Sequence, residues 1–328
     1  MKDEELLQRL AAIEKRLDAL EDSQAQLREA YARSRVHGRR LWLRPPMWTF
    51  EQHSPHPLKP PALLPPPLPP RPPRIAIVTP SFNQGHFLRA TIDSVLGQDY
   101  PNLYYHVQDG GSTDNSVDVL KSFGDRISWR SVPDQGQADA INRGLDGVDC
   151  EIMAYLNSDD TLLPGTLAIA ADSFERLPDV DIIYGHRIFI DHAGMEIGRA
   201  VYPAHDSHAL KYAGYVPQES MFWRKRVWDK VGPIDNDFQY AMDWDFMLRA
   251  EAAGFRMARI PRFLACFRVH DEQKTTKYYE RGRMEMQMLR RRSLGRAPSQ
   301  SELYREMVPY MLRQFIMHWR YRLGLINQ

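Results

Sequence analysis

The feature that most constrains the fold is a series of short apolar segments that alternate with helical patterns between residues 74 and 156. Strands are predicted at 75–79, 104–107, 127–132 and 152–156, and helices at 86–96, 116–123 and 137–145. Such alternation places strands side by side and helices on their faces. The sequence therefore predicts an α/β domain with a largely parallel sheet.

A polar loop follows each of the four predicted strands. These loops cover residues 79–83, 109–114, 134–137 and 157–160. Each is ordinary turn chemistry by itself, because Gly, Asp, Asn and Ser are common in turns for backbone reasons. In parallel sheets, however, ligands bind beyond the carboxyl ends of the strands, and the four loops share that edge. Together they predict a nucleotide-binding crevice.

The last of these loops carries two adjacent carboxylates, Asp159 and Asp160, directly after a buried strand. Two negative charges in such a place are costly unless a cation lies beside them, and a divalent ion that carries a diphosphate meets this need. Taken alone, residues 157–160 fit an Asp-rich turn equally well. The other motifs favour the ligand site.

Eight motifs occur in order between about residues 74 and 277: TPSFNQGHFL, DGGSTDNS, PDQGQADAIN, YLNSDD, YGH, PQES, YAMDWDFMLR and FRVH. This series resembles the inverting family-2 glycosyltransferases of the A-type fold. The resemblance implies a Rossmann-like mixed sheet flanked by helices. It also implies transfer of a sugar from a nucleotide-diphosphate donor to a hydroxyl acceptor with inversion, assisted by Mn²⁺ or Mg²⁺, in glycan or surface polysaccharide synthesis.

The same resemblance assigns the donor site residue by residue. The positions that match nucleotide-sugar-binding residues are Thr79, Pro80, Asn83, Asp109, Asp134, Gln137, Asn157, Ser158, Asp160, Gln218, Glu219 and Arg268. Asp109 matches the carboxylate that accepts a hydrogen bond from the base. This favours a UDP- or dTDP-sugar, because uracil and thymine carry a ring N–H. Asp114, before a predicted helix, is better explained as a capping residue.

The metal site implied by the resemblance consists of Asp159 and His270. The family's first aspartate is replaced here by Asn157, which brings no charge, so the ion relies on Asp159 with Asp160 adjacent. Arg268 is placed to neutralise the leaving group. A purely structural role for His270 is the alternative.

Asp243 matches the family's general base, and Met242 stands where Glu is commoner. The alternative is a helix N-terminal aspartate, since negative charge is favourable in a first turn without any catalysis. Gln218 and Glu219 fall where a sugar is recognised, and core packing explains the neighbouring aromatic residues equally well.

Segments of different composition flank the predicted domain of residues 74–277. Residues 1–40 carry leucine and isoleucine in heptads and predict a coiled coil that forms a homo-oligomer through 1–31, or else an amphipathic helix on its own domain. Residues 41–73 are proline-rich and predict an extended spacer, with a docking peptide as the alternative. Residues 278–328 predict a basic helical extension that covers the site, packs on the domain or contacts an anionic membrane.

Composition adds weaker limits. The 328 residues are 43% hydrophobic with a net charge of +1, which suits an ordinary soluble globular protein with a sizeable core and gives no reason to expect nucleic acid as a partner. Two cysteines exclude a disulfide framework. We expect a cytoplasmic protein, with peripheral contact at the inner face of the membrane as an option, acting on a glycan, lipid-linked or protein acceptor. A catalytically silent nucleotide-sugar-binding scaffold is the alternative function.

Overall fold

The computed structural model describes residues 49–59, 64–271, 273 and 279–326. The chain divides into two compact units, and the fold below is that of the unit Thr49–Gln328. The predicted coiled coil over residues 1–40 lies outside the described residues, so it stays a prediction.

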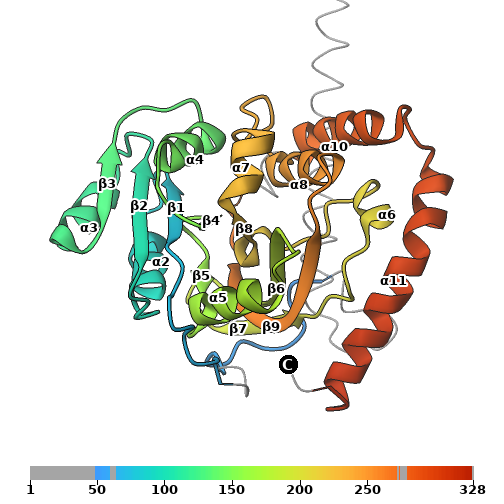
Figure 1. Cartoon of the computed structure of the whole chain (residues 1–328), viewed down its shortest axis with the longest axis horizontal. Helices are drawn as coiled ribbons and strands as arrows, with labels where there is room; N and C mark the ends of the chain where they lie inside the picture. The colour runs from blue at the N-terminus through green and yellow to red at the C-terminus, as the bar shows by residue number, and fades with distance from the viewer. Residues whose placement is uncertain (1–48, 60–63, 272, 274–278, 327–328) are drawn as a thin grey trace, which may run out of the picture. The chain divides into compact units, whose positions relative to one another are not determined.

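The centre of the domain is a mixed sheet with the strand order β3-β2-β1-β4-β8-β6-β9-β5, and β7 pairs with β6 (Figure 1). The first half is parallel and consists of β1 (Ile75–Ser81), β2 (Leu103–Asp109), β3 (Ser128–Ser131) and β4 (Ile152–Tyr155). Helices α2 (Gly85–Leu96), α3 (Ser116–Ser122) and α4 (Gln137–Leu145) connect these strands, with the short helix η3 (Gly124–Arg126) before β3. This half follows the alternation that the sequence predicts.

The second half makes the sheet mixed. It contains β5 (Thr161–Leu162), β6 (Ile182–Ile190), β7 (Glu196–Ala200), β8 (Phe222–Arg224) and β9 (Met257–Arg268). Strand β8 is antiparallel to β4 and β6, whereas β6 and β9 run parallel. The remaining helices before the C-terminal segment are α5 (Thr166–Arg176), α6 (Ser207–Leu210), η4 (Gln218–Ser220), α7 (Lys225–Val231) and α8 (Met242–Ala252). The fold class is therefore α/β, with a mixed sheet flanked by helices.

The packing of the buried strands explains why the polar loops lie close together. All residues of β1 and β4 are buried, as expected for neighbouring strands covered on both faces. Helix α2 packs Leu88, Ile92 and Val95 into the same core. These strands hold their carboxyl ends in register, so the loops that follow them lie along one edge of the sheet.

The proline-rich segment is packed against the domain in its described part. The Gln52 N–H donates to the Ile197 carbonyl over 2.7 Å, and His56 forms an antiparallel bridge with Glu196 at the start of β7. Farther along, the Tyr100 hydroxyl donates to the Pro73 carbonyl over 2.8 Å. Hydrogen bonds therefore tie residues 52–56 and Pro73 to the domain, and the spacer role of residues 41–73 stays a prediction.

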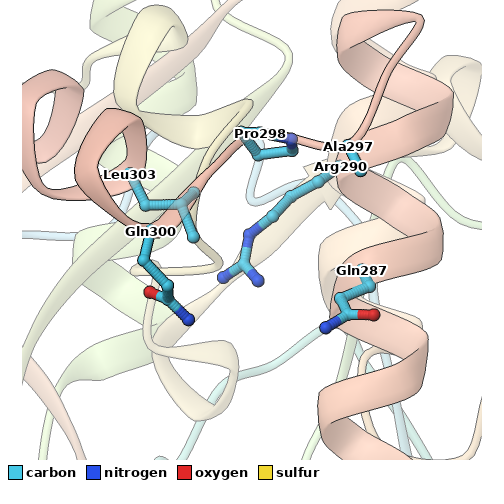
Figure 2. Close-up of a pocket in the computed structure, with 6 residues that line it drawn as sticks. All are labelled: Gln287, Arg290, Ala297, Pro298, Gln300 and Leu303. Atoms are coloured by element: carbon cyan, nitrogen blue, oxygen red, sulfur yellow. The ribbon is translucent and has the colours of Figure 1, made fainter.

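Two helices, α10 (Tyr279–Leu294) and α11 (Gln300–Arg322), form the C-terminal segment. Helix α10 lies beside α8, and α11 passes α6 along one side of the domain (Figure 1). A pocket of about 140 Å³ at the turn between them is lined by Arg290, Pro298 and Leu303 among others, and no predicted site residue lines it (Figure 2). Among the described residues, no helix is long and apolar enough to cross a membrane.

Candidate active site

A cleft of about 780 Å³ opens at the edge of the sheet where the polar loops meet. Eight predicted site residues line it: Pro80, Asn83, Asp134, Gln137, Asn157, Ser158, Asp159 and Asp160. The loop before α8 completes the wall with Asn236, Phe238 and Gln239, which the sequence did not single out. The structure thus brings together loops from four strands and the segment that leads to Asp243.

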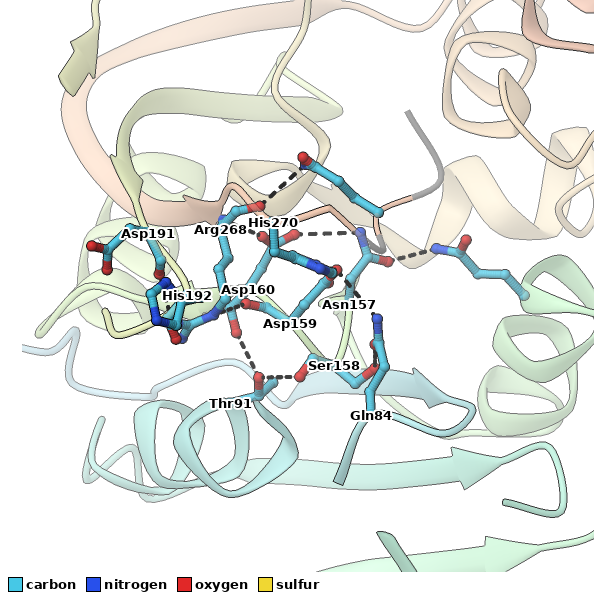
Figure 3. A network of polar contacts seen from close by, with 12 residues as sticks. Gln84, Thr91, Asn157, Ser158, Asp159, Asp160, Asp191, His192, Arg268 and His270 are labelled. Carbon is cyan, nitrogen blue, oxygen red and sulfur yellow. Dashed lines mark hydrogen bonds and ion pairs between the residues drawn. The ribbon is translucent and has the colours of Figure 1, made fainter. Parts of the chain in front are cut away.

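Asp159 and His270 lie next to each other in this cleft region. The distance between Asp159 Oδ2 and His270 Nε2 is 3.0 Å, and the Gln84 amide donates to the same oxygen over 3.4 Å (Figure 3). His270 Nδ1 is buried and has no hydrogen-bond partner among the described residues. A carboxylate and an imidazole in contact, with one ring nitrogen unsatisfied, suit a divalent cation.

Asp160 is buried beneath its neighbour, and Arg268 helps to hold this loop. The Arg268 N–H donates to Asp160 Oδ1 over 3.0 Å. Burial, together with Asp159 and Glu219, raises the pKa of the Asp160 carboxyl well above its ordinary range. The Arg268 guanidinium donates to the carbonyls of Asp159 and Asp191 over 2.8 and 3.0 Å. In this arrangement Arg268 fixes the position of the Asp159 backbone, and its predicted role toward a leaving group stays a prediction.

Asn157 connects the two sides of the cleft. Its Oδ1 accepts from the Gln137 amide over 2.6 Å, and its Nδ2 donates to Gln218 Oε1 over 3.2 Å and to Asp160 Oδ2 over 3.4 Å. Gln218 in turn donates to the Tyr155 carbonyl over 2.8 Å. An aspartate at this position could not donate to two acceptors and would add a third carboxylate to a buried cluster. The departure from the family's aspartate is therefore well accommodated.

The loop after β2 is organised by Asp109, which is fully buried. Its carboxylate accepts from the N–H groups of Gly111 and Ser112 over 3.1 and 2.8 Å and from the Ser131 hydroxyl over 2.6 Å. Its contact with a base stays a prediction. Asp114 accepts from the Ser116 N–H over 2.9 Å at the start of α3, the helix that it was predicted to cap, although Asn115 is the N-cap residue. It also accepts from the Gly85 N–H over 2.9 Å at the start of α2.

Two further predicted residues take different positions at this edge. Thr79 is buried, and its hydroxyl lies 3.1 Å from the Tyr105 hydroxyl; it is not among the described residues that line the cleft. Asp134 does line the cleft, and burial raises the pKa of its carboxyl although the Gly136 N–H opposes the shift. A Cβ added at Gly110 would lie 2.8 Å from Asp134 Oδ2, so glycine is needed there to let this carboxylate approach.

Asp243 is partly buried in the first turn of α8. Its Oδ1 accepts from the Trp244 N–H over 2.8 Å. Burial raises the pKa of Asp243 to about 6, with a further rise from the Glu219 carboxylate, while hydrogen bonds from backbone N–H groups and the Arg187 guanidinium lower it. A carboxylate with a pKa of about 6 can both hold and release a proton near neutral pH, as a general base must.

Glu219 forms a buried ion pair that the sequence did not reveal. The Arg187 Nη1 atom lies 3.3 Å from Glu219 Oε1, and the guanidinium stacks 5.0 Å from the centre of the Phe267 ring. Arg187 comes from β6 and Glu219 from η4. Glu219 thus sets the charge around Asp243 from behind the cleft, and its predicted contact with a sugar stays a prediction.

Helix α10 holds the loop that leads to Asp243. Glu285, which is buried, accepts from three consecutive backbone N–H groups, those of Gln239, Tyr240 and Ala241, over 3.0, 2.8 and 2.9 Å. These hydrogen bonds and Arg281 keep the pKa of Glu285 below its ordinary range, even though burial would raise it. A glutamate in a basic segment carries no sequence signal for such a contact.

Known proteins with similar sequences indicate which protein family has this arrangement. The family model described as "Glycosyl transferase family 2" matches residues 76–233. The PGL/p-HBAD biosynthesis glycosyltransferase of Mycobacterium bovis is 30% identical over 183 residues, which cover 54% of this chain and 69% of that protein.

Two solved structures have a similar fold. TarS 1-349 of S. aureus in complex with UDP-GlcNAc matches with a TM-score of 0.55 and 15% identity over 74% of this chain and 73% of that one. The mannosyltransferase PcManGT from Pyrobaculum calidifontis in complex with GDP-Man and Mn²⁺ matches with a TM-score of 0.53 and 18% identity over 79% and 73%. The match covers only 43% of a longer TarS chain.

Proposed function

The chain belongs to family 2 of the glycosyltransferases, and we propose that it transfers a sugar from a nucleoside diphosphate donor to a hydroxyl group of an acceptor, with inversion at the anomeric carbon. The observation that carries this proposal is Asp243, a carboxylate with a pKa of about 6 directly after the loop that lines the donor cleft. Asp159 lines the same cleft, and His270 contacts it over 3.0 Å.

The proposed reaction is a direct displacement at the anomeric carbon of the donor. The acceptor oxygen forms a bond to the anomeric carbon while the bond from that carbon to the diphosphate oxygen breaks, and its electron pair leaves with the nucleoside diphosphate. Asp243 takes the proton of the attacking hydroxyl. Attack on the face opposite the leaving group inverts the configuration.

Asp159 and His270 are the residues that would hold a divalent cation. The contact of 3.0 Å between them and the unsatisfied Nδ1 of His270 fit such an ion. When bound, the cation neutralises negative charge on the diphosphate. Mn²⁺ or Mg²⁺ is proposed because carboxylate and phosphate oxygens suit both.

The donor is proposed to be a UDP- or dTDP-sugar, as Asp109 predicts. Because Asp109 accepts several hydrogen bonds within its own loop, GDP-mannose also belongs among the donors to be tested. The solved neighbours were captured with UDP-GlcNAc and with GDP-Man, so the fold accommodates both kinds of base.

The acceptor and the membrane contact are part of the same proposal. Helix α11 exposes large apolar side chains along one side, namely Tyr304, Val308, Leu312, Phe315 and Ile316, and Leu323 just after the helix is exposed as well. Arginines at 320 and 322 are exposed on the same helix. Apolar residues beside cations suit peripheral contact with an anionic membrane, and a lipid-linked acceptor would fit this better than a soluble glycan or protein.

The proposal is tested by incubating the protein with Mn²⁺ and each donor and measuring release of nucleoside diphosphate with and without acceptor lipids. Release of nucleoside diphosphate that is lost when Asp243 is replaced supports sugar transfer. Tight donor binding without release for every donor and acceptor would instead favour the silent scaffold.

A further inference from the structure

A second cluster of metal-binding side chains lies away from the cleft, on the edge of β7. His53, His56 and Glu196 offer ligand atoms that all lie within 4.8 Å of one another. Backbone pairing creates this cluster: the bridge between His56 and Glu196 and the hydrogen bond from Gln52 to Ile197 place the histidine segment along β7. None of the three residues is among the described residues that line the cleft.

The two histidines are oriented as metal ligands are. His53 Nδ1 lies 3.0 Å from the Ser54 carbonyl, and His56 Nδ1 lies 2.9 Å from the Pro57 carbonyl. A carbonyl oxygen only accepts, so both Nδ1 atoms carry the hydrogen and both Nε2 atoms keep a lone pair. The rings stack with centroids 4.6 Å apart, and His53 Nε2 lies 3.9 Å from Glu196 Oε1. Bonds from Nδ1–H to a carbonyl are the usual support of a metal-bound imidazole.

Glu196 supplies a fixed carboxylate. The residue is buried, and the Arg199 guanidinium donates to its Oε1 and Oε2 over 2.6 and 2.8 Å. Each carboxylate oxygen has two lone pairs, so Oε1 retains one on the side of His53. Arg199 also balances the negative charge of Glu196, which limits the attraction for a cation. We therefore expect an affinity in the micromolar range, weaker than that of structural zinc sites with thiolate ligands.

We propose that His53 Nε2, His56 Nε2 and Glu196 Oε1 form a binding site for a divalent transition metal, with Zn²⁺ as the preferred ion. Two imidazoles and one carboxylate suit Zn²⁺ far better than Mg²⁺, which selects oxygen ligands. Water would complete the coordination. The bound ion would cross-link the segment 49–59 to β7. This site is independent of the ion proposed at Asp159.

The test is calorimetric titration of tag-free, chelator-treated full-length protein with ZnCl₂, and with CoCl₂ as a probe whose visible spectrum reports the ligand geometry. We expect one site of micromolar affinity, weakened about a hundredfold or more in the double variant His53→Gln/His56→Gln. His208→Gln is the matched control, because His208 also faces a carboxylate, that of Glu306, over 3.0 Å.

A second control separates this site from the donor site. Zinc binding should persist in Asp159→Asn. The proposal is overturned if no zinc binds at 100 µM, a limit on the order of a hundredfold above a dissociation constant of about 1 µM. It is also overturned if binding survives in the double histidine variant and disappears in Asp159→Asn.

Discussion

Asp243→Asn should make the protein more stable and almost inactive. The pKa of Asp243 is raised by burial from the ordinary 3.8 to about 6. The native state therefore binds this proton more tightly than the unfolded state. As pH rises through 3.8 the unfolded chain ionises first, and above about 6 the native state bears the full cost of a desolvated charge. The difference corresponds to about 3 kcal/mol at neutral pH.

Asparagine removes that charge. It retains a side-chain oxygen that can accept from the Trp244 N–H, which in the wild type lies 2.8 Å from Asp243 Oδ1. We expect the free energy of unfolding at pH 7.5 to rise by about 2–3 kcal/mol, and the gain to shrink toward zero near pH 4. Turnover should fall about a hundredfold or more with donor affinity unchanged. In the wild type, kcat/KM should decline below pH 6, because the base is then protonated.

Urea denaturation at pH 7.5 and pH 4.5, calorimetry with UDP and Mn²⁺, and nucleotide release measure these quantities. Asp118→Asn is the matched control, because Asp118 is an exposed carboxylate in the first turn of α3. Its loss should cost at most about 1 kcal/mol and leave turnover intact. If Asp243→Asn is instead destabilised at pH 7.5 and loses turnover in proportion, Asp243 acts as a helix N-terminal residue and the assignment of the base is refuted.

Three other changes test separate parts of the site. Asp159→Asn should remove most Mn²⁺-dependent binding of UDP in calorimetry, and unchanged affinity would exclude Asp159 as a ligand. Glu285→Gln weakens the hold on three backbone N–H groups and should cost about 1–3 kcal/mol of stability while lowering kcat more than UDP affinity; a fall in UDP affinity alone would contradict the positioning role. Deleting residues 1–40 should give a monomer by light scattering that retains activity on a small acceptor, whereas an unchanged oligomer would place the contact elsewhere.

The sequence predicted the first half of the sheet because local information determines it. Strands β1 and β4 are continuous apolar runs, and each is close in sequence to the helix that covers it. The pairing of β6 with β9, by contrast, joins Ile182 to Met257 across six intervening elements. No local pattern specifies that partner, and the mixed character of the sheet depends on it. The two-residue strand β5 is also too short to carry a periodic signal.

The candidate site, like the sheet, could be predicted from the sequence only in part. The loops after parallel strands could be placed together because their strands share one edge, and eight predicted residues do line one cleft. The partners that fix those residues come from distant segments: Gln84 for Asp159, Arg187 for Glu219 and Glu285 for the loop before α8. None of these three partners was predicted to have a role, and their roles become visible only from their contacts in the folded protein. His53 and His56 were not predicted to be metal ligands, because the proline-rich segment that carries them is typical of a spacer.

The basic C-terminal segment gains a physical role from its contacts with α8. Glu285 holds the backbone just before the helix, and Arg292 reaches Asp245, a fully buried carboxylate, over 2.5 Å. One helix thus supplies a negative group to three backbone N–H donors and a positive group to a buried charge, on either side of Asp243. Without α10, Asp245 would be left with its ion pair to Arg249 at 2.7 Å, and three backbone N–H groups would lose their acceptor Glu285, so α10 cannot leave without disturbing the first turn of α8. Helix α10 therefore belongs to the same folding unit as Asp243, whatever surface α11 contacts.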